Sequence, residues 1–204
     1  MPELIDRPEP SEERTAPPEI SLLTVPIDFS LLERVSSFSR LRRVTAWAWR
    51  FIYNCRAKKK NETPARGTLT TKELRTAEER WIAATQHTAF SEEISILQKG
   101  EELRSGRIST LRPFVDPHQL LHVGGRQNLS SVSYDRRHPV ILPGNSTLTK
   151  LIIRGEHLRL LHAGPTLVAA SLARRFHILG GRRAVRTVTP VSYTHLTLPT
   201  KRIV

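Results

Sequence analysis

The stretch STLTKLIIRGEHLRLLHAG, residues Ser146–Gly164, decides how the C-terminal part of the chain is expected to fold. Its periodic apolar residues follow Ser146, a residue type that often caps helices, so the pattern predicts a helix that starts there. On one continuous helix, His157 and His162 would point about 140° apart and could not reach the same metal ion. The helix must therefore end between them for both to bind. The Gly164–Pro165 step is a suitable stop, because Gly accepts the left-handed conformation and Pro cannot continue a helix.

Two further short helices are expected after this stop. The segment GPTLVAASLARRF puts Pro165 at a first helical position, where proline is favoured, and GGRRAVRTV predicts a third, basic helix. A structural zinc site usually has four Cys or His ligands in a tetrahedral array. His157 and His162 alone supply half of that set, so the spacing by itself favours two histidines without a metal.

The segment before residue 106 is expected to be helical. From Asp28, a plausible N-cap, apolar residues recur at steps of three and four, which predicts one amphipathic helix. Its expected apolar face consists of Leu31, Val35, Phe38, Leu41, Ala48, Ile52 and Cys55. Thr70 and Glu73 have the spacing of a capping box and predict the start of a second helix. A shorter helix, SEEISILQKG, is expected to be capped by Ser91 and to end at Gly100.

The amino-acid composition changes after Gly106, where prolines, glycines and β-branched residues become frequent. Two β-rich runs, Leu120–Val123 and Pro139–Leu142, predict a small hairpin. The expected fold is therefore mainly α with a small β-hairpin and disordered termini. The expected segments begin with a disordered acidic, Pro-rich leader (residues 1–27) and a helical linker region (28–105). A loop and hairpin segment (106–146), a three-helix segment (147–190) and a tail (191–204) follow.

The charge of the chain is strongly positive and unevenly distributed. The chain has 204 residues and a formal net charge of +13, with 32 Lys and Arg against 19 Asp and Glu. The first twenty residues hold six of the acids, so 30 bases face 13 acids from Ser21 onward. Such an excess favours a polyanionic partner over an acidic small molecule.

Two groups of basic residues are candidates for nucleic-acid binding. In the first predicted helix, bases at steps of three and four surround Trp47, which could stack on a base or pack on another helix. The candidates there are Arg40, Arg43, Arg50, Lys58, Lys59 and Lys60. The second group, near the third short helix, consists of Arg174, Arg175, Arg182, Arg183 and Arg186.

Cysteine content and hydropathy limit the cellular setting. Cys55 is the only cysteine, so an intrachain disulfide is impossible and an intracellular protein is expected. No apolar run approaches the length of about 18 residues that a membrane helix needs, and the acidic start differs from targeting peptides. We therefore expect no membrane partner.

The pattern of motifs from about Leu31 to Val188, over three quarters of the chain, resembles the polyprotein of BEL/Pao-type LTR retrotransposons between its RNase H and integrase regions. The segments that carry the resemblance are LLERVSSFSRLRRVTAWAWRFIYNCR, GTLTTKELRTAEERWI, FSEEISILQKG, LRPFVDPHQLLHVGGRQNLSSVSYDRRHPVIL and LIIRGEHLRLLHAGPTLVAASLARRFHILGGRRAVRTV. Their order and spacing make the resemblance specific.

The resemblance implies an integrase zinc-binding domain that begins at HLRLLHAG. It makes His157 and His162 zinc ligands in an HHCC-type three-helix bundle, with the other two ligands in a C-x2-C motif beyond the third helix. In this family the complete domain supports DNA binding and multimerisation, whereas strand transfer belongs to a downstream catalytic core. The implied partners are DNA, other regions of the polyprotein and further copies of the parent, in a cytoplasmic particle or the nucleus.

The sequence departs from the family pattern at three places. No cysteine follows Cys55, and His177 stands where the family usually has Trp. The last segment, VSYTHLTLPT, resembles a translated sequencing-library adapter, with a natural Thr-rich tail as the alternative. We therefore expect a truncated zinc-binding domain that holds zinc in the intact parent but not stably here, and no enzymatic activity. The alternatives are a free-standing basic helical protein that binds nucleic acid and an enzyme.

Overall fold

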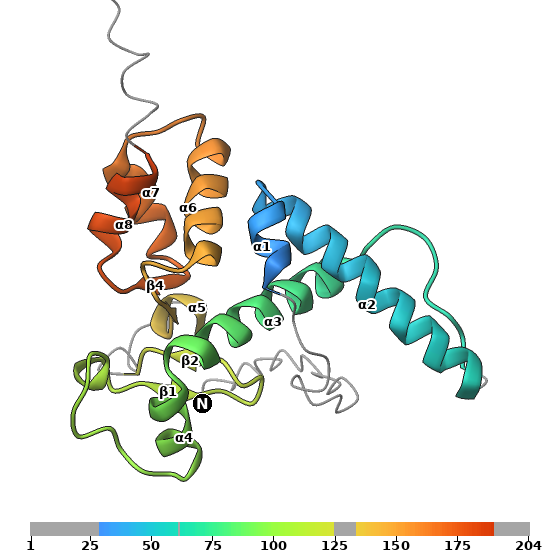
Figure 1. Cartoon of the computed structure of the whole chain (residues 1–204), viewed down its shortest axis with the longest axis horizontal. Coiled ribbons are helices and arrows are strands. Elements are labelled where there is room, and N and C mark those ends of the chain that lie inside the picture. Colours follow the sequence, from blue (N-terminus) through green and yellow to red (C-terminus); the bar gives the residue numbers. More distant parts are fainter. Residues whose placement is uncertain (1–28, 61, 125–133, 190–204) are drawn as a thin grey trace, which may run out of the picture.

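The chain is mainly helical and carries a small four-stranded sheet (Figure 1). The computed structural model describes residues 29–60, 62–124 and 134–189. Its helices are α1 (Ser30–Arg34), α2 (Phe38–Lys60), α3 (Thr71–Ala89), α4 (Ser91–Gln98), α5 (Tyr134–Arg137), α6 (Thr147–Arg159), α7 (Pro165–Leu172) and α8 (Gly181–Val188), with a 3₁₀ turn η1 (Ser109–Leu111). Its strands are β1 (Phe114–Val115), β2 (Leu121–His122), β3 (Val140–Leu142) and β4 (Phe176–Ile178).

The single helix predicted from Asp28 is wrong, because the chain breaks it into α1 and α2. Val35 has extended dihedral angles, and the Ser37 side chain accepts a hydrogen bond from the Arg40 backbone N–H at 3.5 Å. Serine side chains compete with helical hydrogen bonds and favour caps, so the Ser-Ser pair before Phe38 ends one helix and starts another. Asp28 itself lies outside the described residues.

The apolar face predicted for α2 is correct at Leu41 but wrong further along the helix. Ala48 and Cys55 are exposed, whereas Ala46 and Ala57 are buried against the rest of the fold. Helix α2 packs on α3, and its buried residues include Ala46, Ala57 and Arg50.

The starts of the later helices follow from local capping. The predicted capping box of α3 is confirmed: the Thr70 hydroxyl accepts from the Glu73 N–H at 3.3 Å, and Glu73 accepts from the Thr70 N–H at 2.7 Å. Ser146 caps α6 by accepting from the Thr149 N–H at 3.1 Å, and Pro165 starts α7, both as expected. Ser91 does not cap α4, because the buried Phe90 occupies that position.

The predicted hairpin is confirmed and belongs to a larger sheet of order β1-β2-β3-β4. Strands β2 and β3 pair antiparallel, with His122 opposite Val140. The sequence did not predict β1, which pairs antiparallel with β2. It also did not predict β4, which pairs parallel to β3 with Val140 opposite Phe176. Since β4 lies between α7 and α8, it connects the three C-terminal helices to the sheet.

A large apolar core joins the two helical parts of the molecule. Trp81, Leu148, Ile153 and Val185, from α3, α6 and α8, are all buried in one cluster. The helices α6, α7 and α8 pack on one another and form a compact group (Figure 1). None of the helices in the described part of the chain has the length and apolar character needed to cross a membrane.

One buried side chain connects α3 to the sheet. The Gln86 amide nitrogen donates to the carbonyls of Leu121 and Ile141 at 2.9 and 2.7 Å. Its amide oxygen accepts from the Leu121 N–H at 2.9 Å. Gln86 therefore satisfies backbone groups of β2 and β3 that are buried away from water.

Candidate metal centre and basic surfaces

His157 and His162 converge at the C-terminal end of α6. His157 lies in the last turn and is 5% exposed, whereas His162 follows the end of the helix and is exposed. Helix α6 ends between them, at Arg159, earlier than the expected Gly-Pro stop. Leu161 and His162 have positive φ angles of 52° and 63°, so the chain turns back. His162 Nδ1 thereby lies 3.2 Å from His157 Nε2.

This geometry fits two positions of a tetrahedral zinc site. Zn–N bonds of about 2.0–2.1 Å place two tetrahedral ligand nitrogens about 3.3 Å apart. The Nδ1 atom of His157 donates to the Ala163 carbonyl at 3.1 Å, the orienting contact that metal-bound histidines usually make through their second nitrogen. This contact directs the Nε2 atom of His157 towards His162.

The imidazoles of His157 and His162 supply two of the four ligands of a tetrahedral zinc site. Among the described residues, no group of three or more His, Cys, Asp or Glu side chains is placed to hold a metal ion. His177 does not complete the pair, because it lies in β4 opposite Ile141. It is half-buried there, and burial lowers the pKa of its imidazole.

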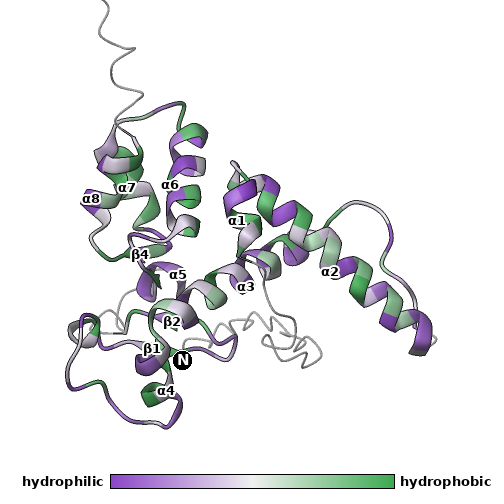
Figure 2. Ribbon diagram, viewed as in Figure 1, coloured by the Kyte–Doolittle hydropathy of each residue, from purple (hydrophilic) through white to green (hydrophobic). Residues whose placement is uncertain are grey.

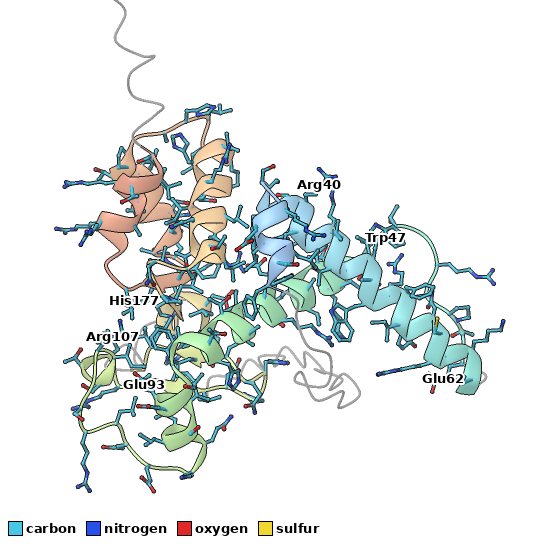
Figure 3. All side chains as sticks on the ribbon, in the orientation of Figure 1. Arg40, Trp47, Glu62, Glu93, Arg107 and His177 are labelled. Carbon is cyan, nitrogen blue, oxygen red and sulfur yellow. The ribbon has the colours of Figure 1, made fainter. Side chains whose placement is uncertain are left out.

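The basic candidates on α2 divide into exposed and buried residues. Arg40, Arg43, Lys58 and Lys59 are exposed, and Lys60 is the last residue of the helix. Trp47 is 51% exposed, so it does not pack into a helix interface (Figure 3). Figure 2 shows the hydrophilic character of the C-terminal end of α2.

Arg50 has a structural position, unlike its exposed neighbours. It is 5% exposed, and its guanidinium forms a bidentate ion pair with Glu73 at 2.6 and 2.5 Å. It also donates to the carbonyls of Gly67 and Thr68. The hydrogen bond from Arg50 is the main reason that the pKa of Glu73 falls to about 2. These four hydrogen bonds use most of the five guanidinium N–H groups, and the side chain is buried, so we leave Arg50 out of the proposed surface.

The C-terminal arginines are mostly available to solvent. Arg174, Arg182, Arg183 and Arg186 are exposed. Arg175 is different: it donates to the buried carboxylate of Glu78 at 2.9 Å, which Arg42 also contacts at 2.8 Å. Arg175 therefore connects the segment before β4 to α3, while the other four remain candidates for contact with a polyanion.

Sequence spacing did not reveal a buried histidine and aspartate pair on the sheet. His122 Nε2 lies 3.3 Å from a carboxylate oxygen of Asp116, and its Nδ1 lies 2.7 Å from the His138 carbonyl. An ionised Asp116 and the His138 carbonyl both accept hydrogen bonds, so the two contacts favour the protonated form of the His122 imidazole. Burial alone would lower the pKa of His122, but the bonds to Asp116 and His138 raise it above its ordinary value. The two residues come together only when β1 and β2 pair.

Comparisons with known proteins do not assign these sites. The chain matches no family model, no curated protein and no solved structure. The functional interpretation therefore depends on the geometry of the residues and on the motif resemblance.

Proposed function

We propose that this chain is part of a BEL/Pao-type retrotransposon polyprotein that covers the linker after RNase H and a truncated integrase zinc-binding domain. Its role in the parent is non-catalytic and consists of DNA binding and support of multimerisation, in a cytoplasmic particle or the nucleus. The main support is the 3.2 Å approach of His157 Nε2 and His162 Nδ1 at the end of a helix that packs on two others.

In the intact parent, zinc would be held by His157, His162 and the two cysteines of the C-x2-C motif that the family places beyond α8. The ion would supply a cross-link between the end of α6 and the segment after α8. The chain itself contributes the orientation of the two imidazoles, through the Ala163 carbonyl and the left-handed turn at Leu161. Two imidazoles alone bind zinc weakly, so the site is a half-site here.

The contacts of the acidic residues favour a non-catalytic role. Asp116 is paired with His122, and Glu156 accepts two hydrogen bonds from Arg159 at 2.8 and 2.6 Å. Both ring nitrogens of His122 are held by contacts within the protein, to Asp116 and to the His138 carbonyl. In the parent, strand transfer would belong to the separate catalytic core.

Zinc binding tests this proposal directly. We would compare this chain with a variant extended after Val188 by a C-x2-C segment at the family spacing, using zinc titration against a chelating dye and thermal unfolding. The extended variant should bind one zinc and unfold at a higher temperature, because metal binding and folding are coupled in such sites. The effect should disappear in its His157→Ala form and persist in its His177→Asn form.

Two results would refute the half-site. One is a tightly bound, stoichiometric zinc that the unextended chain holds through His157 and His162. The other is an extended variant that binds no zinc although it remains folded by far-ultraviolet circular dichroism.

The alternative is a free-standing basic helical protein that binds nucleic acid. The exposed Arg182, Arg183 and Arg186 of α8 support it without any metal. In that case DNA affinity should fall steeply with salt, yet should not change when zinc and the C-x2-C segment are added. A zinc-dependent gain in DNA affinity would favour the retrotransposon fragment.

A further inference from the structure

A groove of about 900 Å³ is lined by α8, by the C-terminal end of α3 and by the turn between β3 and α6. Its apolar lining includes Pro143, Ala184 and Val188. Three bases also line it: Arg107 from the loop after α4 (Figure 3), Lys150 from α6 and Arg183 from α8. The fold therefore brings cations from three distant parts of the sequence to one groove.

The charge of the groove is uncompensated. Arg107, Lys150 and Arg183 are exposed, and none of them forms an ion pair within the described residues. No acidic residue is among the described residues that line the groove. The exposed Arg75 and Arg159, in contrast, are each paired with a carboxylate. Like charges gathered without counter-charge favour an anionic ligand.

Backbone contacts fix the walls of the groove. A Cβ atom at Gly144 would lie 2.1 Å from the Leu179 carbonyl oxygen, so the turn after β3 touches the turn after β4 directly. The Leu179 N–H also donates to the Leu142 carbonyl at 2.9 Å. Helix α8 begins beside this contact, with Gly180 at its N-cap and neither a side-chain cap nor an acidic residue in its first turn. Its positive end is therefore not neutralised by the protein.

We propose that this groove binds the sugar-phosphate backbone of duplex DNA, an inference that rests on the proposed function. The phosphates contact Arg107, Lys150 and Arg183, while the sugar faces pack on the apolar lining. An acidic peptide is the other polyanion that such a groove could take. DNA fits better because Arg182 and Arg186 continue the positive charge along α8 beyond the groove, as a longer ligand requires.

The test compares two triple variants that remove the same charge. The groove variant combines Arg107→Gln, Lys150→Gln and Arg183→Gln. The control variant combines Arg66→Gln, Lys72→Gln and Lys99→Gln, exposed bases that do not line the groove. Binding to a duplex oligonucleotide is followed by fluorescence anisotropy over a range of salt concentrations, and folding is followed by thermal unfolding.

The groove variant should lose at least about tenfold in affinity at low salt, and its log-log salt slope should fall by about 2.7, or about 0.9 for each lost phosphate contact. The control should lose less than about threefold. A conservative triple variant, Arg107→Lys, Lys150→Arg and Arg183→Lys, should retain binding. In the wild-type chain, DNA should protect Lys150 but not Lys72 from lysine-selective labelling, a measurement that needs no variant.

The outcomes separate the two proposals. If the wild-type chain binds duplex DNA but the groove and control variants weaken equally, the groove is refuted and the proposed function stands. If Lys150 is protected by a polyglutamate peptide and not by DNA, the ligand assigned to the groove is wrong. If the wild-type chain does not bind DNA at low salt, both proposals fail.

Discussion

Replacing Gln86 by Leu should detach α3 from the sheet without leaving a large void, because the two side chains have similar volumes. The amide of Gln86 makes three hydrogen bonds to the backbone of Leu121 and Ile141. Leucine makes none of them. Because Leu121 and Ile141 are fully buried, at least the Leu121 N–H and the Ile141 carbonyl would then lose this partner away from water.

The expected loss follows from the cost of each orphaned group. A buried donor or acceptor without a partner costs about 1–3 kcal/mol, so two such groups reduce the free energy of unfolding by about 2–6 kcal/mol. That is a large share of the roughly 5–15 kcal/mol that holds a typical domain together. Urea unfolding followed by far-ultraviolet circular dichroism measures the change, provided that the transition remains two-state.

Gln98→Leu is the matched control. Gln98 is exposed, and its amide contacts only the side chain of Gln119, at 2.7 Å, among the described residues. Its replacement should change stability by less than about 0.5 kcal/mol. Equal effects of the two substitutions would refute the argument that Gln86 satisfies the backbone of the sheet.

Two further predictions concern a titrating pair and two glycines. Because the pKa of His122 is raised above 6.5, its contribution to stability is complete below that pH and is lost as pH rises through the raised pKa. In urea unfolding at several pH values, Asp116→Asn should remove this decline; an unchanged slope would contradict the pairing. Gly144→Ala should destabilise the fold by about 1–3 kcal/mol, because the added Cβ atom would clash with the Leu179 carbonyl oxygen. Gly155→Ala, inside α6, should stabilise it by about 0.5–1 kcal/mol, because the added Cβ atom would lie 3.6 Å from the Phe38 Cβ atom and meet nothing closer. Thermal unfolding distinguishes the two, and equal signs would contradict it.

The features that the sequence predicted correctly depend on residues close together in the chain. The capping box at Thr70 and Glu73, the cap at Ser146 and the helix start at Pro165 involve contacts within one helical turn. The approach of His157 and His162 was only a condition for shared metal binding at the sequence level, because the expected Gly164–Pro165 stop lies beyond both residues and α6 ends earlier, at Arg159.

The features that it missed depend on residues that only folding brings together. The parallel pairing of β4 with β3 joins Phe176 to Val140, and no local periodicity indicates that a three-residue segment between two helices is a strand. Arg50 shares the helical spacing of exposed arginines, yet its partner Glu73 makes it a buried residue. Arg107 and Lys150 carried no motif at all, and their common groove exists only in the folded chain.

The parallel strand pair also affects how the molecule can be divided for experiments. A recombinant piece that starts at Thr147 would keep both histidines but would leave β4 without β3, exposing unpaired amide and carbonyl groups along the edge of an apolar strand. Such edges promote intermolecular association. Biochemical work on the histidine-bearing helices is therefore better served by a polypeptide that retains β3 and the α3 residues packed behind it.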